Sequence, residues 1–263
     1  MAQNNFFDSL FSLSGRTAVV TGGSAGIGEM ISRALIAAGA EVWIVARNAE
    51  RVERTAAALT KTGGICRAIS ADVSFAEGVE KIRSTIAATH RPLDILVNNA
   101  GLSRNAQFGS FPEEIWDQEL AVNLKSPFFV SQALHPLMRR LDREGHPAHI
   151  LNIGSAAGLT IYCEESFSYF PGKAAVHHLS RILAKRFIPD RIHVNVIAPG
   201  RFPSKMTQHI GADEQALAED TALIPMKRWG REEEMAALAI SLASTAGAYM
   251  TGNIIPLDGG FSL

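Results

Sequence analysis

The chain has 263 residues, of which 47% are hydrophobic and 19% charged, and its formal net charge is -1. This length and composition are typical of one globular α/β domain with a large core. A net charge so close to zero provides no positive field, which disfavours binding of nucleic acid or anionic lipid as the main role.

The N-terminal arm, residues 1–14, contains phenylalanines but neither lysine nor arginine. It therefore does not resemble a signal peptide, and no apolar run approaches the ~20 residues that span a bilayer. Cys66 and Cys163 are too few for a disulfide framework, so we expect free thiols in a reducing compartment. We predict a cytoplasmic protein whose arm packs on its own body or on a neighbouring subunit.

A strand, a glycine-rich turn and a helix open the body of the chain. The β-branched run at residues 17–21 precedes the turn at 22–28 and a helical pattern at 27–38. A second strand at 41–46 is followed by a helix at 49–59, for which Asn48 is a plausible N-cap. This βαβ unit predicts two parallel strands.

The same alternation continues to the end of the chain. Further strands are expected at residues 65–70, 95–97, 149–153, 193–198 and 254–257. Further helices are expected after a capping box at Ser74–Glu77, over 113–141 with a kink or restart at Pro127, over 169–187, around 213–220 and over 232–243. The pattern predicts a single-domain, doubly wound, Rossmann-like parallel sheet of about seven strands over residues 15–263, with a substrate lid at about 201–229.

Glycines and polar residues gather at the predicted carboxyl ends of these strands, where ligands bind in such sheets. The turn from Gly22 to Gly28 can bring backbone N–H groups and a helix N-terminus to a pyrophosphate. The second strand ends in Arg47, where a carboxylate would favour a ribose 2′-hydroxyl. A guanidinium pairs better with a 2′-phosphate, so NADP(H) is favoured over NAD(H).

Tyr169 and Lys173 are four residues apart on one helix face, with Ser155 at the neighbouring strand end. An ammonium beside a phenol can lower the pKa of the phenol toward neutrality. This spacing predicts an acid/base pair.

These motifs in this order resemble the short-chain dehydrogenase/reductase family over Gly15 to Leu263. The resemblance rests on the turn at 21–28, Asn98-Asn99-Ala100-Gly101, Pro199-Gly200 with Ser204 and Met206, Leu257-Asp258-Gly259-Gly260, and the tetrad Asn123, Ser155, Tyr169 and Lys173. Within the family, residues 195–204 and 249–253 look most like the NADPH-dependent 3-oxoacyl reductases of rhamnolipid producers.

The resemblance implies metal-free hydride transfer between a nicotinamide and a ketone or secondary alcohol. Tyr169 would be the general acid and base, Ser155 would polarise the substrate oxygen, Lys173 would hold the nicotinamide ribose and lower the pKa of Tyr169, and Asn123 would anchor a water. Cofactor contacts are expected from Gly22, Ser24, Ala25, Gly26, Ile27, Gly28, Arg47, Asp72, Val73, Asn99, Ala100, Gly101, Tyr169, Lys173, Pro199, Gly200, Phe202 and Ser204. A homotetramer, or a homodimer, is the expected assembly.

Three positions depart from the family pattern. Ala25 stands where many NADP-dependent members carry a basic residue, which leaves Arg47 as the main argument for the phosphate. Gly172 stands where serine is common, and Phe187 where an acidic residue is often found.

Other interpretations are open at the substrate end. An apolar crevice is predicted from Phe108, Leu159, Phe167, Phe202, Met206, Ile210, Leu223 and Met226, which suits a 3-oxoacyl thioester or another apolar ketone. The alternatives are a polyol or sugar-acid dehydrogenase, a ketoreductase of secondary metabolism, and a non-catalytic nucleotide-sensing scaffold. Tyr162 is a rival catalytic tyrosine without a lysine four residues on, Cys163 is expected at the substrate entrance, and the scattered histidines do not predict a metal site.

Overall fold

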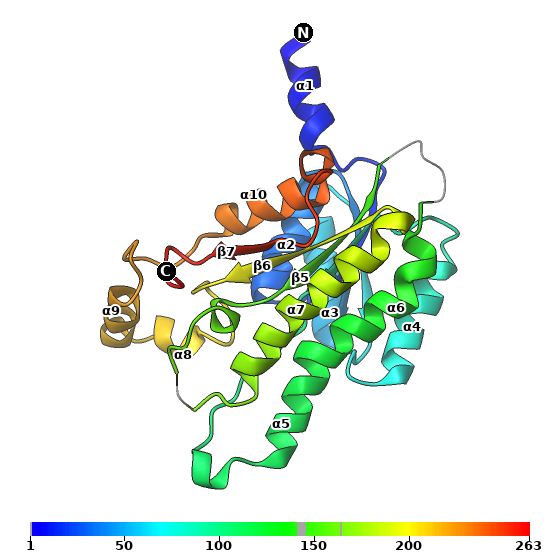
Figure 1. Cartoon of the computed structure of the whole chain (residues 1–263). Coiled ribbons are helices and arrows are strands. Elements are labelled where there is room, and N and C mark those ends of the chain that lie inside the picture. Colours follow the sequence, from blue (N-terminus) through cyan, green and yellow to red (C-terminus); the bar gives the residue numbers. More distant parts are fainter. Residues whose placement is uncertain (1, 141–145, 164) are drawn as a thin grey trace.

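The computed structural model describes residues 2–140, 146–163 and 165–263, which form a seven-stranded parallel sheet. The strands follow the spatial order β3-β2-β1-β4-β5-β6-β7 (Figure 1). Their bounds are β1 Thr17–Thr21, β2 Glu41–Ala46, β3 Cys66–Ser70, β4 Ile95–Asn98, β5 Ala148–Ile153, β6 Ile192–Pro199 and β7 Ile254–Leu257. The order reverses between β1 and β4, and a ligand crevice is expected at such a switch point. The predicted Rossmann-like fold is confirmed.

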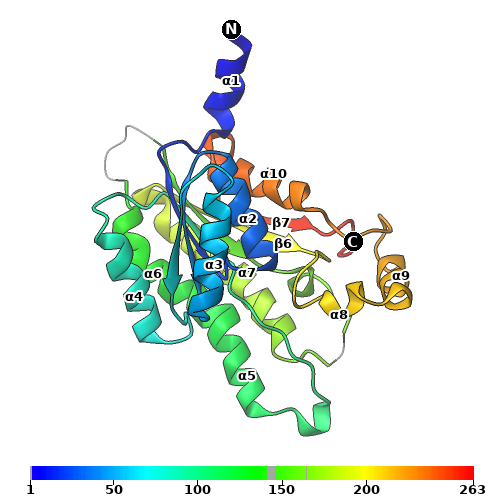
Figure 2. The same cartoon turned by 180° about the vertical axis from the view of Figure 1, so that it is seen from behind.

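Helices cover both faces of this sheet. One face is covered by α2 (Gly26–Ala37), α3 (Ala49–Thr60) and α10 (Glu232–Ala243), seen in front in Figure 2. The other is covered by α4 (Ala76–Ala87), α6 (Ser126–Met138) and α7 (Tyr169–Phe187). Every residue of β1, β4 and β5 is buried, as expected for strands covered on both sides.

The predicted capping box at Ser74–Glu77 is wrong. The N-cap of α4 is Phe75, and no side chain caps the helix. Both the backbone N–H and the hydroxyl of Ser74 instead donate to Oδ1 of Asp72, at 3.0 and 2.6 Å. The nearby carboxylate competes successfully for the serine that the pattern assigned to the cap. The predicted N-cap Asn48 is confirmed, since its side chain accepts the N–H of Arg51.

The helical region predicted over 113–141 is divided into three pieces. Helix α5 (Glu113–Leu120) runs into a π-helical turn, η2 (Ala121–Lys125), and α6 follows with Pro127 in its first turn. The predicted restart at Pro127 is therefore confirmed, because proline is tolerated at a helix start. Helix α6 ends at Met138, while Leu141 lies outside the described residues.

The segment predicted as a lid contains two short helices, α8 (Gln208–Gly211) and α9 (Glu214–Ala222), beyond the arrowhead of β6 (Figure 1). Asp213 caps α9 by accepting the N–H groups of Gln215 and Ala216. The acidic helix expected around 213–220 is confirmed.

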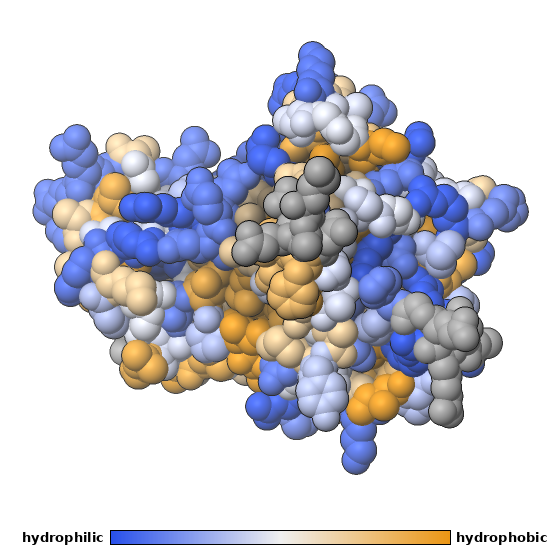
Figure 3. Space-filling view, turned by 90° about the horizontal axis from the view of Figure 1, so that it is seen from above, coloured by the Kyte–Doolittle hydropathy of each residue, from blue (hydrophilic) through white to orange (hydrophobic). Residues whose placement is uncertain are grey.

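The N-terminal arm forms helix α1 (Ala2–Phe11), which projects from the body at the end opposite α5 (Figure 1). Phe6 and Phe7 are 70% and 64% exposed, so the expectation that they pack on the chain's own body is wrong. Figure 3 looks down on this end and shows groups of hydrophobic side chains among hydrophilic ones. Packing of α1 on a neighbouring subunit stays a prediction. No helix among the described residues is long and apolar enough to cross a bilayer.

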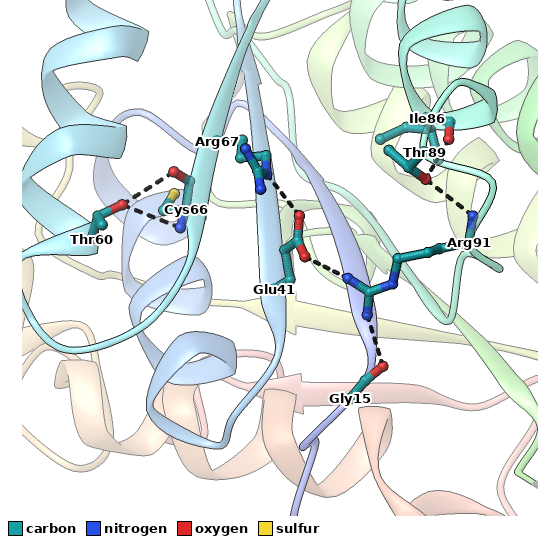
Figure 4. Close-up of polar contacts among 8 residues, drawn as sticks. All are labelled: Gly15, Glu41, Thr60, Cys66, Arg67, Ile86, Thr89 and Arg91. Carbon is teal, nitrogen blue, oxygen red and sulfur yellow. Dashed lines mark hydrogen bonds and ion pairs between the residues drawn. The ribbon is translucent and has the colours of Figure 1, made fainter.

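The amino ends of the strands are tied by a cluster around Glu41, the first residue of β2 (Figure 4). One oxygen of Glu41 accepts Nε of Arg67 at 2.8 Å, and the other pairs with Arg91. Arg91 also donates to the carbonyl oxygen of Gly15 at 3.1 Å. These contacts join β2, β3 and the segments before β1 and β4 at the end of the sheet away from the crevice.

Candidate active site

A cavity of about 610 Å³ lies at the carboxyl ends of the strands and collects residues from the loops after β1 through β6. Gly28 and Asn123 do not line it but contact residues that do. The other predicted site residues line it: Gly22, Ser24, Ala25, Gly26, Ile27, Arg47, Asp72, Val73, Asn99, Ala100, Gly101, Ser155, Tyr169, Lys173, Pro199, Gly200, Phe202 and Ser204.

Gly22 forms the tight corner of the glycine-rich turn. Its φ is +67°, where residues with a Cβ are strained, and a Cβ there would lie 2.7 Å from Nδ2 of Asn99. Asn99 Nδ2 donates to the carbonyl oxygen of Thr21 at 3.0 Å, and the Thr21 hydroxyl accepts the backbone N–H groups of Asn99 and Ala100. The turn after β1 and the loop after β4 are thereby locked together.

The N-terminus of α2 faces the cavity through Ala25, Gly26 and Ile27. Ala25 is the N-cap residue and makes no side-chain capping bond. The first N–H groups of the helix and the positive end of its dipole favour an anion at this place. The arrangement fits the pyrophosphate of a dinucleotide.

Ser155, Tyr169 and Lys173 meet at one wall of the cavity. Ser155 follows β5, whereas Tyr169 and Lys173 lie in the first turns of α7. The Lys173 ammonium donates to the carbonyl oxygen of Ile153 at 2.8 Å and lies 5.7 Å from the centre of the Tyr169 ring. The Ser155 hydroxyl lies close enough to the Tyr169 phenol to stabilise its ionised form. The three groups that the sequence predicted as catalytic are thus adjacent.

Burial shifts the pKa values of both titratable members. It raises the pKa of Tyr169 to about 12, opposed by the Ser155 hydroxyl, and lowers the pKa of Lys173 to about 8. In the chain alone the net pKa of Tyr169 is therefore raised rather than lowered, because desolvation of the phenol outweighs the effects that favour its ionised form. A phenol with this pKa is protonated at neutral pH, which is the state of a proton donor.

Asn123 lies in the π-helical turn η2 and is 1% exposed. Its side chain makes two hydrogen bonds with the backbone of Leu102, accepting the N–H at 3.2 Å and donating to the carbonyl oxygen at 2.8 Å. A Cβ on Gly101 would lie 3.1 Å from Oδ1 of Asn123 and 3.7 Å from Nζ of Lys173. Asn123 therefore supports the cavity wall beside Lys173.

Three charged residues line the cavity next to the carboxyl ends of β2 and β3, namely Arg47, Arg51 and Asp72. The Arg47 side chain is 72% exposed, and its Nη1 lies 3.9 Å from Oδ2 of Asp72. Arg51 is buried at Nε, which has no hydrogen-bond partner among the described residues. The sequence reasoning missed Arg51, although the first turn of a helix that follows β2 directly must lie near this end.

The lining of the cavity differs from the predicted apolar crevice. Of the eight apolar residues expected there, Phe202, Met206 and Ile210 line the cavity. The other five are not among its lining residues, and Phe108 and Phe167 pack against each other instead. The lining instead includes the apolar side chains of Leu102, Val122 and Phe170 together with Arg104, Asn105, Tyr162, Cys163, Ser166 and Arg201.

Tyr162 and Arg201 connect this end to the predicted lid. The Ser155 hydroxyl also favours the ionised form of Tyr162, and the Arg201 guanidinium lies 5.1 Å from the centre of the Tyr162 ring. Arg201 Nε is 2.9 Å from Oδ1 of Asp220 in α9, whose Oδ2 accepts the indole N–H of Trp229 at 2.8 Å. Burial raises the pKa of Tyr162, so its hydroxyl is also protonated at neutral pH.

A family model described as enoyl-(acyl carrier protein) reductase matches residues 22–262. With the seven-stranded sheet and the adjacent serine, tyrosine and lysine, this match shows that the chain belongs to the short-chain dehydrogenase/reductase family of oxidoreductases. The family predicted from the motifs is confirmed.

Individual relatives cover almost the whole chain. The rhamnolipids biosynthesis 3-oxoacyl-[acyl-carrier-protein] reductase of Pseudomonas aeruginosa is 54% identical over 253 residues, 96% of this chain and 98% of that protein. The 2-dehydro-3-deoxy-D-gluconate 5-dehydrogenase of Escherichia coli is 35% identical over 257 residues, 96% of this chain and 98% of that protein. The Pseudomonas aeruginosa RhlG/NADP active-site complex has a TM-score of 0.93 at 54% identity and covers 97% and 99% of the two chains. The predicted likeness to the reductases of rhamnolipid producers is confirmed.

The sequence analysis also missed two buried polar residues near the wall of the cavity where Ser155, Tyr169 and Lys173 meet. His177 in α7 accepts the backbone N–H of Ser155 at 3.4 Å, and burial lowers its pKa to about 4. Glu119 in α5 is fully buried. In the sequence both stand in ordinary helical patterns, and only their burial in the fold distinguishes them from surface residues.

Proposed function

We propose that this chain is an NADP(H)-dependent oxidoreductase that transfers hydride between a nicotinamide and a ketone or secondary alcohol, with Tyr169 as general acid and base. The observation that carries this proposal is the meeting of Ser155, Tyr169 and Lys173 in one cavity with the glycine-rich turn. The similarity to a 3-oxoacyl reductase and to the RhlG/NADP complex supports the reaction and the coenzyme.

In the reductive direction, the Ser155 hydroxyl donates to the carbonyl oxygen and the Tyr169 phenol delivers its proton to the same atom. When bound beside these residues, a nicotinamide would supply the hydride for this reduction. The Lys173 ammonium stabilises the resulting phenolate and holds the ribose hydroxyls, and Asn123 anchors a water that returns a proton. Oxidation of an alcohol uses the same groups in reverse.

The proposed cofactor site extends from the α2 N-terminus to the loop after β6. The turn at Gly22–Gly28 would hold the pyrophosphate, Asp72 and Val73 would contact the adenine, and residues 99–101 would contact the adenosine ribose. The nicotinamide side is formed by Pro199, Gly200, Phe202 and Ser204, each of which lines the cavity.

Arg47 and Arg51 are the proposed ligands of the 2′-phosphate. Position 25 carries no charge, because it is alanine. The two guanidinium groups line the same end of the cavity, and the buried Nε of Arg51 lacks a protein partner among the described residues. A phosphate would provide charge-assisted hydrogen bonds to both.

A 3-oxoacyl thioester is the first candidate substrate, on the basis of the 54% identical relative. The polar part of the lining favours a second candidate, a sugar acid or polyol, because hydroxyl and carboxylate groups need polar partners. Arg104, Asn105 and Tyr162 supply such partners, and the Escherichia coli relative is named for a sugar acid.

The test compares turnover of 3-oxoacyl-CoA thioesters, cyclic ketones, polyols and 2-dehydro-3-deoxy-gluconate by the wild-type chain with NADPH or NADP⁺. Tyr169→Phe should lower kcat/KM at least about a thousandfold, while NADPH still binds, as followed by nicotinamide fluorescence. Unchanged turnover in the variant would remove Tyr169 from the reaction. NADPH binding without turnover of any class by the wild type would favour the sensing scaffold.

The proposed assembly is a homotetramer or homodimer in the cytoplasm, with residues 1–14 as an arm and residues 201–229 as the lid of one catalytic domain. Exposed apolar side chains on α5, α6 and α7 support an interface, because Trp116, Phe129 and Ile182 are 40%, 42% and 56% exposed. Light scattering of the purified chain would measure the assembly.

A further inference from the structure

Glu119 is a buried carboxylate beside the catalytic wall that the proposed chemistry does not use. It lies in the last turn of α5, is 0% exposed, and is not among the residues that line the cavity. One carboxylate oxygen accepts the hydroxyl of Ser168 at 2.7 Å, and the other accepts the backbone N–H of Arg104. A buried carboxylate is unfavourable without such donors, so both contacts are needed to keep it there.

The first partner, Ser168, immediately precedes Tyr169. It occupies the N-cap position of α7 but makes no side-chain capping bond, because its hydroxyl is directed to Glu119. The first turn of α7 then contains Pro171, whose φ is fixed by its ring, followed by Gly172, whose backbone is conformationally permissive. A Cβ on Gly172 would lie 3.4 Å from Cδ2 of Leu120, so α7 packs closely on the end of α5 at this point.

The second partner, Arg104, lies in the loop after β4, which forms the facing wall of the cavity. Asn123, four residues after Glu119, holds the same loop through the backbone of Leu102. The end of α5 and the turn after it therefore bind this loop through two nearby contacts, Glu119 with Arg104 and Asn123 with Leu102. Only the Glu119 contact also reaches the residue next to Tyr169.

We propose that Glu119 is a positioning residue for Tyr169: its carboxylate joins Ser168 to the backbone of Arg104, fixes the start of α7 against the loop after β4, and places a negative charge near the phenol. This inference rests on the proposed function only in taking Tyr169 as the acid and base. Glu119 touches neither substrate nor cofactor.

The electrostatic part of this role follows from the groups around the phenol. Burial is the main cause of the raised pKa of Tyr169, and the charge of Glu119 raises that pKa further. Removal of this charge would lower the pKa of Tyr169. The other titratable or charged groups facing the pair are Tyr162, Lys173 and Arg201 beside the phenol and Arg104 beside the carboxylate.

Two variants separate position from charge. In Glu119→Gln the amide oxygen can accept the Arg104 N–H while the amide nitrogen donates to the Ser168 hydroxyl, so the bridge is retained without the charge. In Ser168→Ala the charge is retained and the bridge is broken. Ser244→Ala is the matched control, because Ser244 is also 0% exposed and its hydroxyl donates to the carbonyl oxygen of Ser241 in α10, away from the cavity.

The measurements are kcat and KM with NADPH and a substrate found by the panel above, the pH profile of kcat, NADPH binding by fluorescence, and thermal unfolding. Ser168→Ala should lower kcat roughly tenfold, the effect of a small misplacement of the acid, with KM and Kd for NADPH unchanged. Glu119→Gln should keep kcat within about twofold of the wild-type value at the optimum pH. The inflection of the pH profile of kcat that reflects the pKa of Tyr169 should move to lower pH.

The inference is overturned if Ser168→Ala has the kcat of Ser244→Ala and differs only in its unfolding temperature, or if Glu119→Gln leaves the pH profile in place. These results would not affect the proposed function, which fails if Tyr169→Phe remains active or if the wild type turns over no class of substrate. An inactive Tyr169→Phe with an unaffected Ser168→Ala would reject Glu119 alone.

Discussion

The two ends of the parallel sheet hold buried or half-buried polar groups in different ways. At the amino ends, Glu41 is bound on both oxygens by Arg67 and Arg91 (Figure 4). At the carboxyl ends, the guanidinium of Arg51, the N-terminus of α2 and the hydroxyl of Ser155 all face an open cavity. The Glu41 charge at the amino ends is matched within the protein, whereas at the carboxyl ends the buried Nε of Arg51 has no hydrogen-bond partner among the described residues.

This difference shows where the fold carries its function. Helix N-termini and loop residues after parallel strands lie at one end of the sheet by construction, so polar groups there can bind a ligand without interrupting the core. Polar groups at the amino ends of the strands face no ligand cavity and must form hydrogen bonds or ion pairs with one another. Three side chains depart from this pattern: Thr17 Oγ1, His193 Nδ1 and both ring nitrogens of His149 in β5 have no hydrogen-bond partner among the described residues.

The largest effect is expected at the carboxyl ends from Ser155→Ala. Loss of the hydroxyl that polarises the substrate oxygen should lower kcat by about 10²–10³-fold, with NADPH binding and the unfolding temperature close to those of the wild type. Steady-state kinetics and thermal unfolding measure this. A large loss of stability with little loss of rate would show that this end also serves the fold.

The amino ends should instead control acid stability through His149. Burial lowers its pKa to about 3 from an ordinary value of 6.5, so the unfolded chain binds a proton between these values that the folded chain does not. Stability is fully present above pH 6.5 and declines as the pH falls toward 3, by about 3 kcal/mol at pH 4.

Urea unfolding at pH 7 and pH 4 measures this loss. His149→Leu removes the group, and the loss between the two pH values should shrink by the same amount in that variant. His177, whose pKa is lowered to about 4, keeps a residual dependence. An equal loss in variant and wild type would mean that His149 is not the acid-sensitive group.

A smaller effect is expected from the arginine that faces the cavity. Arg51→Ala should raise the Kd for NADPH about tenfold, or 1.4 kcal/mol, and leave the Kd for NADH unchanged, because only NADPH carries the 2′-phosphate. Arg54→Ala is the matched control, since Arg54 lies in the neighbouring groove and does not line the cavity. Equal changes for both coenzymes would place Arg51 away from the phosphate.

The smallest effect is expected from the matched charges of the amino ends. Glu41→Gln should lower the free energy of unfolding by about 1 kcal/mol, since both guanidinium groups are half-exposed and can be hydrated. NADPH binding and kcat should not change. Glu80→Gln removes an exposed pair with Arg83 and should cost less than Glu41→Gln. A reduced kcat in Glu41→Gln would contradict the conclusion that the amino ends of the strands contribute only to stability.

The sequence was sufficient to predict the sheet, most helices and the gathering of Ser155, Tyr169 and Lys173 at one cavity, because apolar runs and glycine turns report local structure directly. Ser155, Tyr169 and Lys173 could be placed together because strand ends in this fold converge. The capping box at Ser74 failed because Asp72 competes for the same hydrogen bonds.

Side-chain burial and lining were less predictable. Glu119 resembles a surface residue in its helix, and its burial depends on the separate positions of Ser168 and Arg104. The prediction that Phe108 and Phe167 line an apolar crevice was wrong, because these rings pack on each other. Such outcomes depend on contacts between distant segments, which a residue pattern does not encode.

The π-helical turn at 121–125 changes the rotation of α6 about the helix axis relative to α5. The backbone N–H of Ser126 reaches the carbonyl oxygen of Ala121, five residues back, so this turn holds one residue more than an α-helical turn. Deleting one residue from it would rotate α6 by about 100° relative to α5. Either Asn123 would turn away from Leu102, or Val130, Leu134 and Met138 would turn out of the core. The extra residue lets one nearly continuous helix serve the active site at its start and the core at its end.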